Sequence, residues 1–184
     1  MLSRRHVLGL MAVMLASPAR AEHPSVAYMR SVGKDMLAAH RQGTVSAFMR
    51  VIQRHADVSG IGAYSLGDYN NKLPAGQRAR YNRGVANFMA RYFAEQSHIY
   101  TIAKYDIGEA TVDGDDILVA SKVYLMDGQT YNVMWRLHWT GGRYRVTDAK
   151  VLGFSLTYMQ RGIFTSFVAK QKGNIGPLIV ALNR

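Results

Sequence analysis

The side chains of this chain that could do chemistry are histidines and carboxylates, and their spacing does not suit a metal ion. The histidines are scattered: His6, His23, His40, His55, His98 and His138. No HExxH or similar pair of ligands occurs among them. Asp113, Asp115 and Asp116 form an acidic cluster, but the later glutamate of a calcium-binding loop is missing. The Asp113-Gly114 pair predicts a hairpin turn there instead, and no metal site is predicted.

Nucleophilic catalysis is equally poorly supported, whereas acid–base catalysis stays open. The segment Gly153-Phe154-Ser155-Leu156 lacks the second glycine of a nucleophile elbow. The absence of cysteine excludes thiol nucleophiles, disulfides and thiolate metal sites. Asp57, His55 or Asp106 would serve as acid or base if one of them lay inside a cavity. An enzyme acting on a small apolar substrate is therefore an alternative, and no catalytic residue is assigned.

The elements that would position these residues begin with a helical half. Apolar residues at helical spacing predict three helices, over residues 24–42, 45–56 and 77–96. Gly43 is suited to ending the first of them. Gly60, Gly62 and Gly67 interrupt the stretch between the second and third helices, so short helical turns are expected there.

The middle of the chain changes from helical to strand periodicity. Four strands are predicted, over residues 105–112, 117–126, 131–140 and 143–152, joined by glycine-containing turns. Short turns between consecutive strands give an antiparallel meander. A helix over residues 156–171 with Ser155 as its cap follows, and a short helix over 178–182 begins after Pro177.

One face of the predicted sheet is strongly apolar. Alternation places Tyr131, Val133, Trp135, Leu137 and Trp139 on one face, and Asn132, Arg136 and His138 on the other. A second apolar row comes from Ile117, Val119, Val123 and Leu125. The helices must cover this face. Periodicity alone leaves open whether they pack against it in a closed core, as most interiors do, or leave a cavity.

The first 21 residues have the layout of an export signal. Arg4 and Arg5 precede an apolar run over residues 7–16, and Ala19-Arg20-Ala21 is a small-x-small cleavage site. The run is shorter than the roughly 20 residues that cross a bilayer. Residues 3–8 also resemble a twin-arginine signal. We therefore expect a cleaved signal peptide over residues 1–21, one domain over residues 22–184, and a soluble periplasmic protein.

The chain is basic, which bears on its partners. It has 23 lysines and arginines against 12 acidic residues. Removing the three arginines of residues 1–21 leaves a net charge of +8. Basic surfaces suit nucleic acid or anionic membranes. Export removes nucleic acid from the expected partners, so anionic lipid, or an interaction module with a basic face and no cargo, remains.

A family resemblance is carried mainly by the C-terminal third. An aromatic residue, Tyr144, is followed by a strand with Asp148, the turn Gly153-Phe154-Ser155-Leu156, and a helix with Arg161 and Phe164. The chain closes with Gly173 and Leu178-Ile179-Val180-Ala181-Leu182. Upstream, Asp57, Leu66-Gly67 and the 77–92 helix also match. This order resembles the MlaC family, the toluene-tolerance auxiliary family of periplasmic phospholipid-binding proteins.

The resemblance implies an α+β, NTF2-like fold in which helices wrap a curved antiparallel sheet of about four strands around a central hydrophobic cavity. It implies a monomeric carrier whose cargo is phospholipid and which needs no other cofactor. Its partners would be an outer-membrane lipoprotein–porin complex and an inner-membrane ABC transporter with an MCE-domain ring, and lipid transport between them would maintain outer-membrane lipid asymmetry.

Strand alternation together with the family architecture predicts the residues of the cavity wall. They are Phe88, Tyr92, Val119, Val123, Val133, Trp135, Leu137, Val146 and Phe164. The sequence departs from the family pattern at Tyr144, where tryptophan is usual, at Gln160, where tyrosine is common, and around Asp57, which lacks flanking aromatic residues. These departures bear on the cargo, and another lipid such as a hopanoid is an alternative.

The cleavage site gives a first testable prediction. Processing after Ala21 should leave Glu22 as the first residue of the exported protein. Intact-mass analysis of protein recovered from its native periplasm measures this directly. Recovery of a mature form that still begins at Met1 would contradict the predicted export route.

Overall fold

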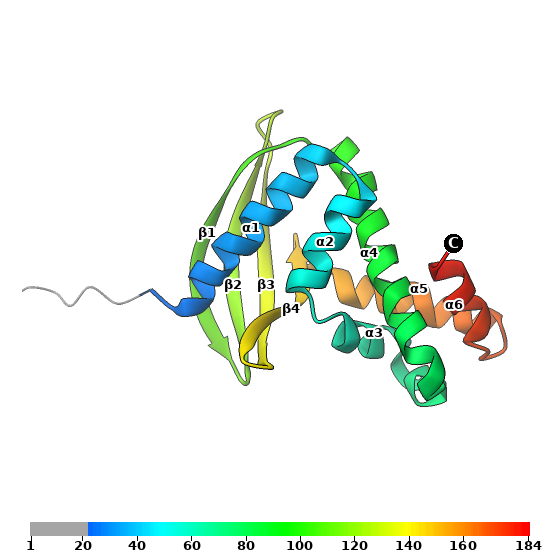
Figure 1. Ribbon diagram of the computed structural model, residues 1–184. Helices are drawn as coiled ribbons and strands as arrows, with labels where there is room; N and C mark the ends of the chain where they lie inside the picture. The colour runs from blue at the N-terminus through cyan, green and yellow to red at the C-terminus, as the bar shows by residue number, and fades with distance from the viewer. Residues whose placement is uncertain (1–21) are drawn as a thin grey trace, which may run out of the picture.

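The computed structural model describes residues 22–184, so the predicted signal peptide lies outside the described residues. Within this range no helix is long and apolar enough to cross a membrane. The described residues form six α-helices and a five-stranded sheet, and Figure 1 shows how they are arranged. In chain order the elements are α1 (Pro24–Gln42), α2 (Val45–His55), α3 (Val58–Leu66), the 3-10 turns η1 (Gly67–Lys72) and η2 (Ala75–Gln77), α4 (Arg78–Ile99), β1 (Ile102–Asp113), β2 (Asp116–Leu125), β3 (Thr130–Thr140), β4 (Arg143–Val151), β5 (Phe154–Ser155), α5 (Leu156–Lys170) and α6 (Gly176–Leu182).

The helices begin and end at residues suited to those positions. Gly43 ends α1 with a φ of 63°, a left-handed conformation that glycine adopts without steric cost. The Ser155 hydroxyl accepts a hydrogen bond from the Tyr158 N–H at 3.0 Å and so caps α5, as predicted. The long helix α4 continues three residues beyond its predicted end, to Ile99.

The sheet is an antiparallel meander in the order β1-β2-β3-β4-β5. Its register pairs Val119 with Trp135 and Val123 with Tyr131, so the two predicted apolar rows share one face. The α+β class and the curved sheet are confirmed. The fifth strand, β5, was not predicted because two residues are too few to show alternation. A register shift between β3 and β4 after Arg136 adds a bulge, which increases the local bend of the sheet.

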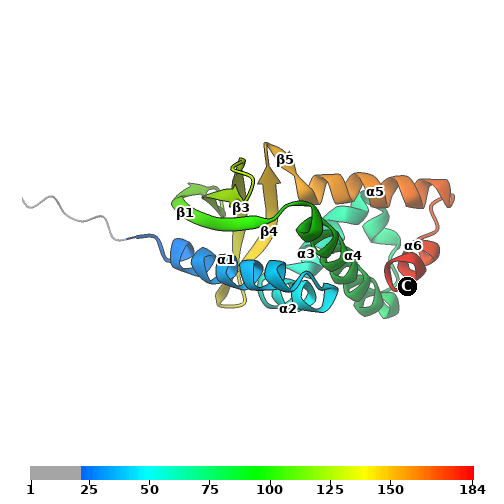
Figure 2. The ribbon, with the colours of Figure 1, turned by 90° about the horizontal axis from the view of Figure 1, so that it is seen from above.

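Three apolar clusters connect the elements. Helix α1 lies along the sheet, where Met29 and Val32 pack against Val119 and Leu137 (Figure 1). A second cluster, which includes Phe48, joins α1, α2 and α4. The third joins α3, α4, α5 and α6, away from the sheet; seen from above, α5 leads out of the sheet into this helical group (Figure 2). The other helices therefore pack mainly against one another, and α1 is the helix that packs along the sheet.

A glycine permits the close approach of α1 to β1. A Cβ atom at Gly33 would lie 2.4 Å from a ring carbon of Tyr105, well inside van der Waals contact. The Tyr105 hydroxyl in turn donates a hydrogen bond to the Arg30 carbonyl at 3.4 Å. The ring of Tyr105 therefore packs directly against the helix at Gly33, and its partial burial raises the pKa of its hydroxyl.

Two neighbouring residues of α5 test which side of this helix supports the fold. Phe164 is 1% exposed and meets the ring of Phe88 edge-on, with ring centroids 5.1 Å apart, whereas Ile163 is 50% exposed. Phe164→Ala should lower the free energy of unfolding by about 3–5 kcal/mol, since it removes a buried ring and leaves a cavity. Ile163→Ala should change it by less than about 1 kcal/mol. Urea unfolding of the two variants measures the difference, and equal losses would contradict the described packing of α5.

Candidate functional site: a branched hydrophobic cavity

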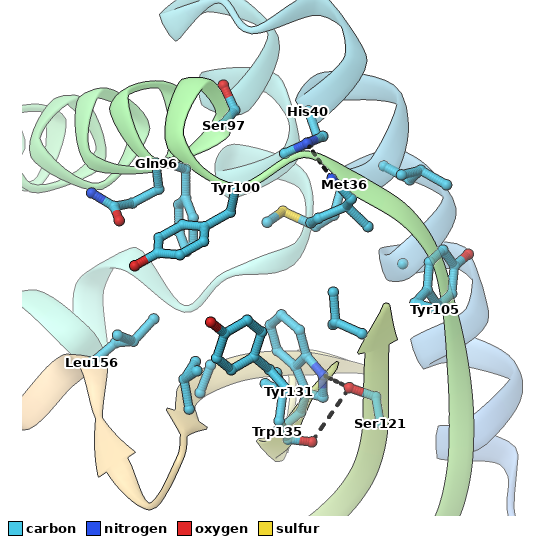
Figure 3. Close-up of a pocket in the computed structure, with 18 of the residues that line it drawn as sticks. Met36, His40, Gln96, Ser97, Tyr100, Tyr105, Ser121, Tyr131, Trp135 and Leu156 are labelled. Atoms are coloured by element: carbon cyan, nitrogen blue, oxygen red, sulfur yellow. Dashed lines mark hydrogen bonds between the residues drawn. The ribbon is translucent and has the colours of Figure 1, made fainter. Parts of the chain in front are cut away.

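A hydrophobic cavity of about 330 Å³ lies where the helices and the inner face of the sheet diverge. This first pocket is walled by α1, by the C-terminal end of α4, and by β1 to β4 (Figure 3). The sheet contributes alternate residues, which the period of two places on one face. The main apolar wall residues are Met29, Met36, Leu37, Phe48, Phe93, Ile107, Val123, Leu125, Val133, Trp135, Ala149 and Val151.

Polar side chains occur mostly at one end of the first pocket. Gln96, Ser97 and Tyr100 extend from the end of α4, and Tyr131 faces Tyr100 across the space (Figure 3). The rings of Tyr100 and Tyr131 meet edge-on, with centroids 6.1 Å apart. His40 closes the same end by accepting the Ile102 N–H at 3.1 Å, and burial lowers the pKa of His40. The described lining contains no aspartate, glutamate, lysine or arginine, so this pocket suits an apolar ligand.

The polar atoms deeper in the wall are satisfied by one another. The indole N–H of Trp135 donates to the Ser121 hydroxyl at 2.9 Å, and that hydroxyl donates to the Val133 carbonyl at 3.3 Å. These two linked hydrogen bonds fix the orientation of the Trp135 ring, whose apolar surface faces the cavity. Buried polar groups paired in this way cost little free energy.

A second, smaller pocket of about 110 Å³ continues from the first toward the helical group. The two share six lining residues: Met36, Tyr92, Phe93, Trp135, Ala149 and Leu156. The second pocket reaches between α2, α4 and α5, where Phe88, Met89, Met159 and Ile163 line it. Together the two pockets form a branched cavity.

The structure brings six of the nine predicted wall residues to this cavity. Val123 and Val133 line the first pocket, Phe88 and Val146 line the second, and Tyr92 and Trp135 line both. The other three, Val119, Leu137 and Phe164, are packed in closed clusters. Val119 and Leu137 point to the predicted face, but α1 covers that part of it. Contact of these residues with lipid remains a prediction.

Sequence reasoning missed the helical half of the wall. Met36 and Phe93 occur at helical spacing with other apolar residues of the first and the long helix, but an amphipathic face does not show whether it meets a core or a cavity. Tyr100 follows the end of α4 and carried no periodic signal. Gln160 was noted as a departure from the family pattern, and it lines the second pocket.

The carboxylates considered for acid–base catalysis do not line the branched cavity. Asp57 caps α3 by accepting the Gly60 N–H at 2.9 Å and borders an open polar groove on the other side of the sheet. Asp106 is exposed on β1. His55 does line the second pocket, but both of its ring nitrogens already have partners. Neither Asp57 nor Asp106 thus reaches the cavity, and the carboxylate that does line the second pocket, Asp148, accepts the Thr157 N–H at 3.1 Å.

The acidic cluster of the first hairpin is held by basic side chains on the outer face of the sheet. Arg136 donates to Asp113 and to Asp116, each at 2.8 Å, and His138 lies 2.8 Å from Asp116. These hydrogen bonds hold the pKa of Asp116 below its usual value against the opposing effect of burial. Among residues 22–184 no group of three or more metal-ligating side chains is present.

Hydrogen bonds between α1 and α2 hold His55 in the wall of the second pocket. The His55 Nε2–H donates to Asp35 at 2.8 Å, and Arg54 donates to the same carboxylate oxygen at 3.1 Å. Nδ1 of His55 lies 3.3 Å from the Tyr28 hydroxyl. The hydrogen bond from His55, with the nearby Arg54, holds the pKa of Asp35 below its usual value of 3.8 although partial burial opposes this.

The lowered pKa of Asp35 predicts how stability depends on pH. A carboxyl group whose pKa is lower in the folded state stabilises the fold above its unfolded pKa, and this contribution disappears as the pH falls through the folded value. Asp35→Asn should therefore melt at a lower temperature than the parent at neutral pH. The difference should shrink as the pH falls below 3.8, because the parent carboxyl becomes protonated. Asp115→Asn, at an exposed turn position, is the matched control and should shift melting little at any pH. A deficit in Asp35→Asn that stays constant from pH 7 to about pH 2 would contradict the inferred ion pair.

Comparison with known proteins gives one family and one fold. The family model described as MlaC protein matches residues 29–184. No match is found among curated proteins. Among solved structures, the chain is similar to a phospholipid-binding protein from Ralstonia solanacearum, whose structure is in complex with a phospholipid. The two share 18% sequence identity and a TM-score of 0.70, over 85% of this chain and 93% of that one. At this identity the likeness shows a common fold.

Proposed function

Because this chain belongs to the MlaC family, we propose that it is a periplasmic carrier which holds the acyl chains of a phospholipid in the branched cavity. The observation that carries the proposal is the lining of the first pocket, which among the described residues contains no aspartate, glutamate, lysine or arginine, and whose histidine, His40, accepts the Ile102 N–H. The similar Ralstonia solanacearum structure holds a phospholipid, which supports the same class of cargo.

The physical task explains why a cavity of this kind is needed. Each methylene exposed to water costs about 0.8 kcal/mol, so an acyl chain of about 16 carbons opposes free diffusion by roughly 12 kcal/mol. A carrier must cover most of that length with apolar side chains. The wall residues from β2, β3 and β4 do this on one side, and those from α1 and α4 do it on the other. The polar end formed by Gln96, Tyr100 and Tyr131 suits the boundary between tail and head group.

A carrier accounts for the site better than an enzyme does. Acid–base catalysis needs a titratable group within hydrogen-bond reach of the substrate. Asp57 and Asp106 lie away from the branched cavity, and the nitrogens of His55 are engaged. Asp148 borders the second pocket, where it accepts the Thr157 N–H at the start of α5. Binding of tails requires only shape and apolar surface, which the cavity has.

Family membership and the charge of the chain support a route for the proposed carrier. We propose that the chain is exported with cleavage of residues 1–21, and carries lipid as a monomer between an outer-membrane lipoprotein–porin complex and an inner-membrane ABC transporter with an MCE-domain ring. The net charge of +8 over residues 22–184 suits approach to anionic lipid surfaces, where each basic residue contributes about 1 kcal/mol.

Two adjacent residues of β3 test the proposal. Val133 is 7% exposed and lines the first pocket, whereas its neighbour Met134 is 38% exposed on the other face. Val133→Arg places a cation where the tail would lie, and a long side chain in a cavity can extend toward the opening. We expect a folded protein with several-fold less bound phospholipid than the parent. Met134→Arg should keep the parent's lipid content. Circular dichroism, melting and mass spectrometry of organic extracts measure these outcomes.

Either of two results would count against the carrier. A folded Val133→Arg protein with unchanged lipid content would show that the first pocket is not the binding site. If Val133→Arg does not fold, Ala149→Phe gives the answer, because Ala149 lines both pockets and phenylalanine fills space there without adding charge. Overpacking of this kind costs about 1–3 kcal/mol if the site has no room. A folded Ala149→Phe protein that still binds lipid fully would contradict the proposal.

A further inference from the structure

The second pocket is lined by a buried amide whose oxygen accepts no hydrogen bond from the described residues. Gln160 lies on α5, is only 5% exposed and lines this pocket. Its Nε2 donates a hydrogen bond to the Ser65 hydroxyl of α3 at 2.8 Å. Among the hydrogen bonds of residues 22–184 none reaches the carbonyl oxygen, Oε1, of the same amide.

The orientation of this amide is fixed by its partner. The Ser65 hydroxyl has a single proton, and it donates that proton to the Ile61 carbonyl at 2.7 Å. Toward Gln160 the hydroxyl can therefore only accept, so the amide must present its nitrogen to Ser65. Exchanging the amide oxygen and nitrogen would place two acceptors against each other. Oε1 consequently points away from the α3–α5 contact.

The free oxygen is reached from the cavity. No buried side-chain nitrogen or oxygen of the described residues is both sealed from solvent and without a partner. Since Oε1 has no partner, a water-sized molecule must be able to touch it. The residue is otherwise buried, and the space that it borders is the second pocket. Around it the lining is largely apolar, with Phe88, Met89 and Ile163 among its members.

We propose that the second pocket, through Gln160 Oε1, binds a hydroxyl group carried on the buried part of the lipid cargo. The inference rests on the proposed carrier function and adds a preference to it. A lipid hydroxyl donates to Oε1, which leaves the Gln160–Ser65 hydrogen bond intact. A neutral hydroxyl donates the single hydrogen bond that Oε1 lacks, and it brings no charge that burial would have to desolvate. A plain tail in the same place would leave Oε1 buried without a partner, which is the costly arrangement for an acceptor.

The test compares tails that differ only by a hydroxyl group. Stearic acid and hydroxystearic acids, with the hydroxyl near the carboxyl group, at mid-chain or at the terminus, compete with a fluorescent fatty acid for the delipidated protein. For the parent we expect at least one hydroxylated tail to compete about tenfold better than stearic acid, which is the effect of one buried hydrogen bond. In Gln160→Leu this preference should vanish while stearic acid binds at least as well as before. Met159→Leu, which changes an adjacent member of the same lining, should keep the preference.

Three outcomes would overturn the inference, and they are distinguishable. Equal competition by all tails in the parent would show that Oε1 accepts its hydrogen bond from water and not from the cargo. A preference that survives Gln160→Leu would place the hydroxyl elsewhere. Failure of stearic acid itself to bind the parent would overturn the carrier function and the inference together. If Gln160→Leu does not fold, the double variant with Ser65→Ala and Gln160→Leu is used in place of the single variant. It removes both partners of the hydrogen bond, and loss of both partners is better tolerated than loss of one.

Discussion

The structure depends on an apolar sheet face that is larger than the helix packed against it. Helix α1 closes one part of this face, where Met29 and Val32 are buried against the strands. The other helices pack chiefly on one another, in clusters that include Phe48 and Phe164. They span the rest of the sheet without filling the space beneath. Apolar surface that would normally be buried in a close-packed core is thereby kept available for a ligand.

The distribution of polar groups follows from this arrangement. On the outer face of the sheet Arg136 joins Asp113 and Asp116, whereas Asp148 of β4 is buried and borders the second pocket. Inside, some polar atoms are paired with one another, as in the Trp135–Ser121 hydrogen bond, and others are gathered at the end of α4 or, like Gln160 Oε1, border the second pocket. An unpaired charge in the cavity would cost too much, and an unpaired hydrogen-bonding group somewhat less. The wall of the cavity is therefore mainly apolar, with hydrogen-bonding groups at the end of the first pocket and with His55, Asp148 and Gln160 in the second.

Histidines take structural places at the borders of the cavity. His40 accepts the N–H of Ile102, at the start of β1, and so ties α1 to the sheet. His55 ties α2 to α1 through Asp35. Both roles hold the elements that wall the cavity in position. The ring nitrogens of these two histidines are thus used in hydrogen bonds between elements of the fold.

The sequence by itself determined the elements and their faces. Period-two alternation gave the inner face of β3, and capping residues such as Ser155 gave helix boundaries, because both signals depend only on residues close in the chain. The order of many weak matches indicated the family. Leu137 and Val133 lie on the same face of β3, and only the tertiary structure decided that Leu137 is packed in the core while Val133 lines the cavity. That difference depends on where α1 ends its contact with the sheet, and on the packing of helices distant in sequence. The free oxygen of Gln160 is likewise set by Ser65, 95 residues away, and no local pattern encodes such a contact.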